Sequence, residues 1–395
     1  MAPRDRTADD GLGRALAALA LGWFLTLGAR FLLPAILPQV RATFGIGDAT
    51  AGAAVSIIWV GYGLMQFPAG ALADRVDERT LLAASLVLAG ASLAATAAAP
   101  AFAVFLVACA LFGLGTGLFG PPRGIALSNL FAPTPGRAFG ITLAAGSLGS
   151  AALPFLASVL AEGSSDGWRL GVGLAAPLFI ATAAATWQYV PADTGSEDAD
   201  DGEVVPLGRT LRRALPDRRV SVAVAGLTLM LFAFQALTAF LPTYLIRAKG
   251  ISQGVAGALF GALFVAGAAF QLVGGDAVDR YGARAVMTAV AAATVATLAA
   301  LPLVAGLVPV AAVVVLLATQ MAVQPVMNSY IIDALPPEGT GTAWGFLRTA
   351  FFLIGATGST VVGVLSERGL LDESFYLLAG ITAVAVLCFL LLPDE

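Results

Sequence analysis

The chain has 395 residues, of which 58% are hydrophobic and only 12% are charged, and its formal net charge is −4. An ordinary soluble domain carries about 25% charged residues, so this composition excludes a soluble globular protein. The net negative charge and the lack of a basic patch exclude nucleic acid as a partner. Histidine is absent, and the two cysteines lie in apolar runs, so we expect no metal, disulfide or other cofactor.

Apolar runs of about twenty residues alternate with short charged segments along the whole chain. A helix of that length crosses a bilayer core about 30 Å thick. We therefore predict an all-α integral membrane protein with twelve spans, at residues 14–38, 49–73, 80–99, 101–131, 138–161, 169–190, 219–246, 253–275, 284–305, 308–334, 341–365 and 373–392.

The first span carries an arginine deep in the membrane. Arg30 lies about 24 Å along the helix from Arg14, at 1.5 Å per residue, and Thr26 shares its helical face. An ionised residue at the centre of a membrane helix costs about 2.5–3.5 kcal/mol on insertion scales. We expect Arg30 to contact a substrate anion, with Thr26 beside it. The alternative is an arginine that snorkels or pairs with a helix carbonyl.

The second span contributes Tyr62 and Gln66, which are one helical turn apart and which we predict to line the same cavity. It ends in a loop with Asp74, Arg75 and Arg79. Aspartate at a helix end can accept bonds from a neighbouring helix N-terminus, and arginines can meet carboxylates or lipid phosphates. We predict that these three residues take part in gating.

The rest of the first half has one more arginine within a span. Arg123 lies about two turns from the cytoplasmic end of the fourth span, and we predict a gate residue, with substrate contact as the alternative. Residues 191–218 break the apolar rhythm with an acidic run at 196–203. We interpret them as a cytoplasmic linker between an N-terminal bundle at 1–190 and a C-terminal bundle at 219–395.

The second half repeats features of the first. A glycine and an aspartate-arginine pair recur at an offset of 205 residues, in Gly70-Ala71-Leu72-Ala73-Asp74-Arg75 and in Gly275-Asp276-Ala277-Val278-Asp279-Arg280. Gly140 and Gly345 match at the same offset. Such a series indicates the duplication of a six-helix bundle. Asp279, Arg280 and Arg284 are therefore the second set of predicted gate residues.

Further polar residues lie within the spans of the second half. We predict a cavity lining from Gln235 in the seventh span and from a stripe in the tenth, where Gln320, Gln324 and Asn328 recur every fourth residue. For each of these the alternative is interhelical hydrogen bonding. Arg348 in the eleventh span has the same two interpretations as Arg123.

The two aspartate-arginine loops resemble the signature loop of the major facilitator superfamily, and the similarity extends over the whole chain. In the first copy Asp77 and Glu78 replace a glycine and a basic residue that the family usually has. The resemblance implies two pseudo-symmetric six-helix bundles that rock about a substrate site near the membrane midplane.

The spacing of Arg30 and Pro38 indicates which branches of the superfamily the chain resembles most. It is similar to that of the organic-anion and organophosphate branches, in which an arginine eight residues before a proline contacts the anion. Phe234 stands where those proteins have a second arginine. The Gly-Pro pair that is usual in helix five of proton-coupled drug antiporters is absent from residues 146–154.

The distribution of basic residues predicts the orientation. With the N-terminus inside, thirteen basic residues fall on cytoplasmic segments and five on the opposite side, so both termini should be cytoplasmic in a multi-pass protein of the cell membrane.

From these features we predict a monomeric secondary transporter, not an enzyme, that moves a small organic or inorganic anion by alternating access. A proton or a counter-anion would be the coupling ion. The alternatives are proton-coupled efflux of apolar drug-like compounds and a non-transporting membrane sensor or scaffold.

Overall fold

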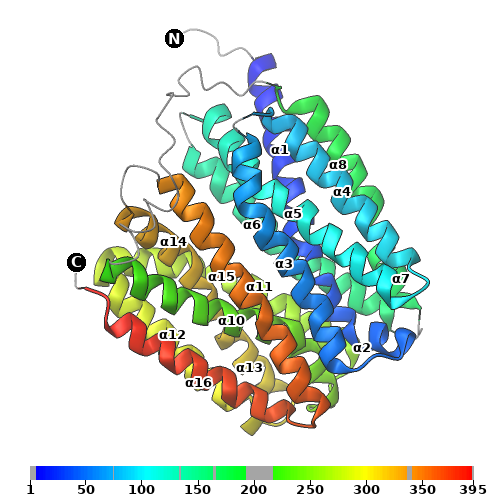
Figure 1. Ribbon diagram of the computed structural model, residues 1–395, viewed down its shortest axis with the longest axis vertical. Helices are drawn as coiled ribbons and strands as arrows, with labels where there is room; N and C mark the ends of the chain where they lie inside the picture. The colour runs from blue at the N-terminus through cyan, green and yellow to red at the C-terminus, as the bar shows by residue number, and fades with distance from the viewer. Residues whose placement is uncertain are drawn as a thin grey trace.

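The computed structural model describes residues 6–73, 75–132, 135–162, 166–192, 217–335 and 340–393, and in these ranges the chain forms only helices and the turns between them (Figure 1). The helices are α1 (Arg6–Ala29), α2 (Leu32–Phe44), α3 (Asp48–Ala73), α4 (Glu78–Ala98), α5 (Phe102–Leu130), α6 (Pro135–Ala161), α7 (Gly167–Gly173), α8 (Ala175–Tyr189), α10 (Arg218–Arg247), α11 (Gln253–Tyr281), α12 (Ala283–Leu303), α13 (Leu307–Leu317), the 3-10 helix η1 (Ala318–Ala322), α14 (Val323–Ala334), α15 (Thr340–Glu367) and α16 (Leu371–Leu390).

These helices form twelve spans that are long and apolar enough to cross a membrane, so the predicted all-α, twelve-span fold is confirmed for the described residues. One span consists of α1 and α2, one of α7 and α8, and one of α13, η1 and α14. We call the side on which α1 begins and α16 ends the terminal face, and the side on which α2 ends and α3 begins the distal face. Asp74 and the acidic run 196–203 lie outside the described residues, and the division into two bundles at 191–218 stays a prediction.

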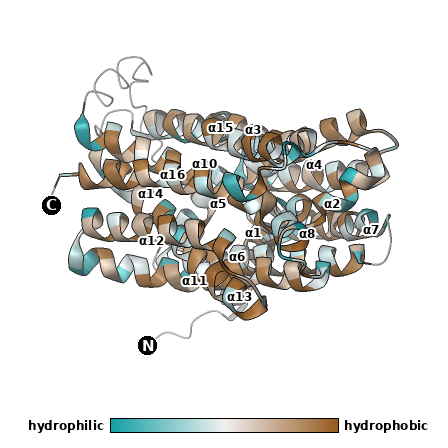
Figure 2. Cartoon of the chain, turned by 90° about the horizontal axis from the view of Figure 1, so that it is seen from below, coloured by the Kyte–Doolittle hydropathy of each residue, from teal (hydrophilic) through white to brown (hydrophobic). Residues whose placement is uncertain are grey.

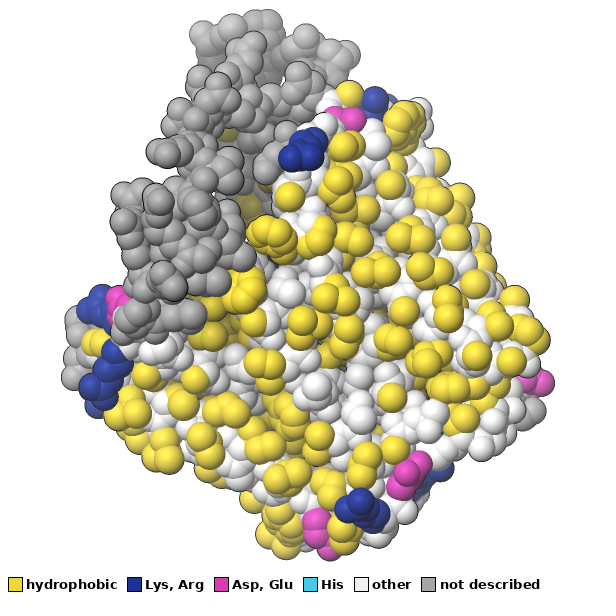
Figure 3. Space-filling model, viewed as in Figure 1, with side chains coloured by type: hydrophobic (Ala, Val, Ile, Leu, Met, Phe, Trp, Pro, Cys, Tyr) yellow, Lys and Arg dark blue, Asp and Glu magenta, His cyan; other side chains and the backbone are white. Residues whose placement is uncertain are grey.

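The outer surface is built for contact with lipid. Figure 2 shows hydrophobic helix segments around the perimeter, and in Figure 3 the visible face is largely hydrophobic, with charged side chains near its margins. The principal contacts between spans one to six and spans seven to twelve are made by α3 with α15 and by α6 with α11.

Three spans are interrupted, and each interruption lies close to the fourth residue before a proline. Proline lacks the N–H that would bond to that residue's carbonyl, and its ring clashes with the same carbonyl. Pro34 accounts in this way for the break at Arg30 and Phe31, Pro177 for the break near Leu174, and Pro325 for η1. Other intrahelical prolines, such as Pro68, are accommodated without a break.

The break at η1 corrects the predicted polar stripe on the tenth span. Gln320 lies in η1, whereas Gln324 and Asn328 lie on α14. A 3-10 helix has 3.0 residues per turn and not 3.6, so Gln320 is rotated away from the line through the other two. The prediction of one stripe holds only for a continuous α-helix.

Two glycines set how closely the first span approaches the fifth. A methyl group on Gly28 of α1 would overlap the backbone of Gly149 of α6, and a methyl group on Gly149 would overlap the carbonyl of Phe24. Small residues allow membrane helices to pack backbone against backbone in this way. The contact holds the segment with Trp23 and Arg30 directly against α6.

Candidate substrate-binding site

Arg30 lies at the break between α1 and α2 and is only 1% exposed. Its Nε donates a hydrogen bond to the Thr26 carbonyl oxygen, 3.0 Å away, while its Nη2 is buried and has no hydrogen-bond partner. The guanidinium carbon lies 4.1 Å from the ring centre of Tyr62, 5.3 Å from that of Trp59 and 5.5 Å from that of Trp23. Aromatic faces attract a cation, so three rings hold the Arg30 charge where no carboxylate does.

Arg123 of α5 reaches the same group of rings. Its guanidinium carbon lies 4.2 Å from the ring centre of Trp23, and its Nη1 donates to Thr142 Oγ1 of α6 at 3.0 Å. The residue is 8% exposed, and its Nε is buried without a partner. Because Trp23 also contacts Arg30, two guanidinium groups from different spans share one indole ring.

Arg348 brings a third guanidinium from α15, in the other half of the chain. Its Nη2 donates to the Tyr62 hydroxyl oxygen at 3.4 Å, and its Nε is buried without a partner. Tyr62 thus contacts Arg30 through its ring and Arg348 through its hydroxyl group. We call Arg30, Arg123 and Arg348 the arginine cluster.

Four hydrogen-bond donors around this cluster are buried and unpaired. They are Trp23 Nε1, Arg30 Nη2, Arg123 Nε and Arg348 Nε. Within the described residues no acidic side chain pairs with the cluster, because the ion pairs found there involve other arginines. Buried donors are normally satisfied, so this arrangement is suited to a ligand that offers only acceptors, such as an oxyanion.

Aromatic side chains cover the distal side of Arg30. The ring centre of Phe31 lies 4.4 Å from that of Phe264, 6.3 Å from that of Phe260 and 6.4 Å from that of Phe234. Phe31, Phe260 and Phe264 are each at most 2% exposed. Exposure increases in the other direction, since Arg348, only eight residues from the start of α15, is half-buried. The cluster is therefore closer to solvent on the terminal side.

The structure divides the predicted neutral residues into two groups. In the first, side chains bond to the helices. Thr26 Oγ1 donates to the Gly22 carbonyl at 2.8 Å, and Gln66 Nε2 donates to the carbonyls of Tyr62 and Gly117 at 3.2 and 3.3 Å. Only the bond from Gln66 to Gly117 joins two helices, as the alternative interpretation expects, and the other two bonds lie within one helix. Gln66 Oε1 is buried without a partner.

The second group consists of the four amide side chains in the second half of the chain. Gln235 and Gln320 are buried, and neither the nitrogen nor the oxygen of either side chain has a partner. Gln324 and Asn328 are half-buried, and Asn328 Oδ1 is unpaired. The hydrogen bonds of the arginine cluster go to Thr26, Thr142 and Tyr62 and not to these four residues, so their role in binding stays a prediction.

The predicted gate residues are found in three different settings. Arg79 lies over the ring of Trp187 at 4.4 Å, within the same half, and Asp279 and Arg280 are exposed at the end of α11. Arg75 lies in the turn after α3, and Arg284 lies in the first turn of α12. Arg123 and Arg348 lie with Arg30 at the cluster.

The sequence analysis missed an ionic contact at the distal face. Asp48, at the start of α3, is 3% exposed. Its Oδ1 lies 2.7 Å from Arg41 Nε, and its Oδ2 accepts hydrogen bonds from Arg247 Nη1 and Ser366 Oγ, both at 2.7 Å. Arg41 could have been suspected, because it flanks the same short turn, but the other partners are 199 and 318 residues away.

Comparison with known proteins agrees with this architecture. The sequence profile described as Major Facilitator Superfamily matches residues 19–359 and 245–395. No curated protein matches the sequence. Among solved structures, a bacterial homologue of the human lysosomal transporter Spinster, inward-facing and unoccupied, has a TM-score of 0.80 at 16% identity, over 97% of each chain.

Two other solved structures share the fold. The nucleoside transporter NupG, in the form of a point mutant, has a TM-score of 0.80 at 14% identity, over 96% of this chain and 100% of its own. The xylose transporter XylE from E. coli, partially occluded and inward-open, has a TM-score of 0.75 at 14% identity, over 95% and 98%. The similarity to all three concerns the fold.

Proposed function

We propose that this chain, which belongs to the Major Facilitator Superfamily, is a secondary transporter that moves a small organic anion across the cell membrane by alternating access. The observation that carries the proposal is the set of four buried, unpaired donors around three guanidinium groups. Their positive charge lies in a region of low dielectric, where an unpaired charge is costly. A bound anion would satisfy the donors and neutralise part of that charge.

The surroundings of the cluster support an organic anion with a carboxylate over a bare inorganic ion. Trp23, Trp59 and Tyr62 lie against the Arg30 guanidinium, and Phe352 lies 5.8 Å from the Arg348 guanidinium carbon. Ring faces offer no hydrogen bonds to an inorganic ion but can contact the apolar body of an organic one. A carboxylate has two oxygens that accept charge-assisted hydrogen bonds, and each of the three guanidinium groups has one buried, unpaired donor, which suits the charged end.

The distal contacts support a direction of access. The ionic contact at Asp48 and the aromatic group around Phe31 separate the cluster from the distal face. We infer that this conformation is accessible from the terminal face. The bias of basic residues supports a cytoplasmic position for that face, with both chain ends inside the cell.

Coupling to a counter-anion fits the interior better than coupling to a proton. Asp48 is the only buried acidic residue in the described part of the chain, and it is engaged by Arg41, Arg247 and Ser366. A side chain that carries a proton must exchange it with water in one state and be shielded in the other. The arginine cluster, in contrast, can hold one anion on the way in and another on the way out.

A thermal-shift screen of the purified protein against carboxylates, phosphates, sugars, nucleosides and apolar drugs tests the proposal. A ligand at 100 times its Kd stabilises the folded state by about 2.7 kcal/mol, so specific binders stand out. We expect carboxylates to raise the Tm, and the best of them to be taken up by proteoliposomes. Stabilisation by sugars, nucleosides or apolar drugs alone would contradict the anion assignment. Binding without uptake would indicate a sensor.

A further inference from the structure

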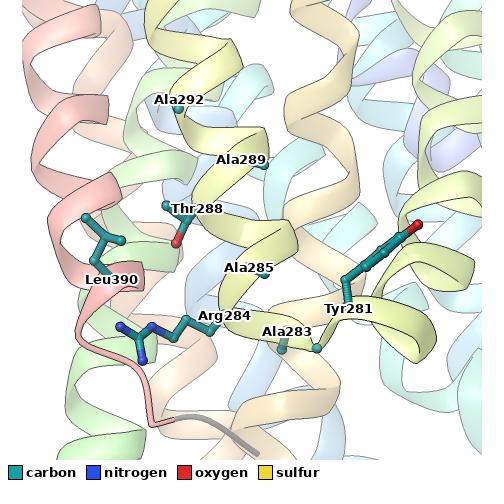
Figure 4. A pocket seen from close by; sticks show the side chains of 9 residues that line it. Tyr281, Ala283, Arg284, Ala285, Thr288, Ala289, Ala292 and Leu390 are labelled. Atoms are coloured by element: carbon teal, nitrogen blue, oxygen red, sulfur yellow. The ribbon is translucent and has the colours of Figure 1, made fainter.

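A groove lies away from the arginine cluster, at the terminal face between α12 and α16. It encloses about 390 Å³. Figure 4 shows it along the first three turns of α12, with Leu390 of α16 on the other side. Ala285, Ala289 and Ala292 form its apolar wall, since their spacing places them on one face of the helix. Arg284 and Thr288 are its polar residues.

The hydroxyl group of Thr288 indicates a missing ligand in the groove. Thr288 Oγ1 is buried and has no hydrogen-bond partner. A threonine in a helix can donate to the carbonyl four residues earlier, as Thr294 does to Val290 at 2.9 Å, but Thr288 does not. The Arg284 side chain extends from the first turn of α12 toward the end of α16, at the outer end of the groove (Figure 4).

The start of α12 differs from the start of α4, which occupies the matching place in the first half. Asp77 caps α4, and its Oδ1 and Oδ2 accept hydrogen bonds from the Thr80 backbone nitrogen at 2.9 Å and from Thr80 Oγ1 at 2.7 Å. At an offset of 205 residues the cap of α12 is Gly282, which has a φ of 79° and offers no side chain. In the first half the Asp77 carboxylate thus lies at the N-terminus of the helix. In the second half no side chain takes that place, and the groove lies there instead.

We propose that the α12 groove binds a glycerophospholipid from the leaflet at the terminal face. The phosphate lies at the start of α12, where Arg284 and the positive end of the helix attract it. Thr288 Oγ1, about 6 Å further along the helix axis, donates to an oxygen of the glycerol ester region. One acyl chain then lies along Ala289, Ala292 and Leu390 and covers the apolar wall.

The position of the groove favours a lipid over free phosphate. Inorganic phosphate would use the polar end and leave the apolar wall uncovered. Along α12 the cation of Arg284 comes first, the hydroxyl group of Thr288 second, and the side chains of Ala289 and Ala292 last. Phosphate, ester and acyl chain follow one another in the same order in a phospholipid that enters from the membrane surface.

Native mass spectrometry of the detergent-purified protein, titrated with phosphatidylglycerol, tests the proposal. We expect one tightly held lipid. Arg284→Gln should weaken its binding about tenfold, which corresponds to the loss of a hydrogen bond to a charged group. Thr288→Val keeps the shape of the side chain and should weaken binding to a smaller extent. Ala289→Phe fills the groove and should abolish binding.

Arg79→Gln is the matched control, because Arg79 occupies the equivalent position beside a helix that Asp77 already caps. It should leave lipid binding unchanged. The proposal is wrong if Arg284→Gln and Ala289→Phe bind the lipid as the parent does, or if Arg79→Gln weakens binding equally. It is also wrong if inorganic phosphate displaces the lipid or binds as tightly, since the apolar wall would then contribute nothing. Elution at the parent's volume in size-exclusion chromatography shows that each variant is folded.

Discussion

Arg247 and Asp48 form an ion pair across the two halves of the molecule, with 2.7 Å between Nη1 and Oδ2. The contact joins the last turn of α10 to the first turn of α3 at the distal face. Ser366, at the end of α15, donates to the same carboxylate oxygen. A transporter that alternates must open this face, so this contact has to break, and so does the hydrogen bond from Gln253 Nε2 of α11 to the Ala35 carbonyl oxygen of α2, 2.6 Å away.

The first prediction is that Asp48→Asn shifts the conformational equilibrium toward a state that is open at the distal face. Each hydrogen bond to a charged group contributes about 1.5–3 kcal/mol, and the substitution weakens the bonds from Arg247 and Ser366. Spin labels at the exposed residues Ala42 and Arg368, one in each half, should report a longer distance in the variant than in the parent.

Ser366→Ala is the control for that measurement. It removes a neutral donor and leaves both arginine pairs, so its distance distribution should lie closer to that of the parent. If Asp48→Asn leaves the distribution unchanged, the ion pair does not hold the distal face closed.

The second prediction concerns Tyr62, which links two members of the arginine cluster. Tyr62→Phe keeps the ring over Arg30 but removes the oxygen that accepts from Arg348 Nη2. The loss of one such bond costs about 0.5–1.5 kcal/mol, so anion affinity should fall by up to about tenfold. In a double-mutant cycle Arg348→Gln should have a smaller effect in the Tyr62→Phe background. Fully additive effects would show that the two side chains act independently.

Much of the fold could be predicted because its cause is local. Apolar runs of membrane length indicate spans wherever they occur. The intramembrane position of Arg30 also follows from its own span. Prolines alone do not predict where a span is interrupted, because Pro34 and Pro325 follow a break whereas Pro68 lies inside an uninterrupted helix. The 3-10 segment in the tenth span was therefore not expected, and it turns Gln320 out of line with Gln324 and Asn328.

The assembly of the site could not be predicted, because it depends on packing between distant segments. Arg123 and Arg348 lie close to the terminal end of their spans by count, which favoured a gate role. Only the packing of α5 and α15 against α1 and α3 shows that both reach the rings around Arg30. The partners of Asp48 are likewise set by the tertiary structure, since Arg247 is 199 residues away.

The third prediction concerns orientation and rests on the bias of basic residues. Single cysteines placed in the 196–203 run should react with a membrane-impermeant reagent only from the cytoplasm. Those placed at 163–167 should react only from outside the cell. Labelling of both segments from the same side would contradict the proposed orientation and the number of spans between them.

The last prediction separates the candidate functions at Arg30. If Arg30 binds the substrate anion, Arg30→Lys should bind the best carboxylate from the thermal-shift screen weakly, because lysine keeps the charge but loses the planar two-pronged donor. Arg30→Gln should lose about 2–5 kcal/mol of binding free energy, the range for removing one partner of a buried charge pair.

The folded yield of Arg30→Gln completes this test. The yield should hold or rise, because a costly intramembrane charge is gone, although the bond from Arg30 Nε to the Thr26 carbonyl is lost as well. If Arg30 is only a structural residue, the yield should fall, and the protein that folds should bind the carboxylate normally. A transporter of apolar compounds should keep its affinity for them in Arg30→Gln. A variant that folds well and still binds the carboxylate with the parent's Kd would rule out Arg30 as the anion ligand and leave the fold assignment intact.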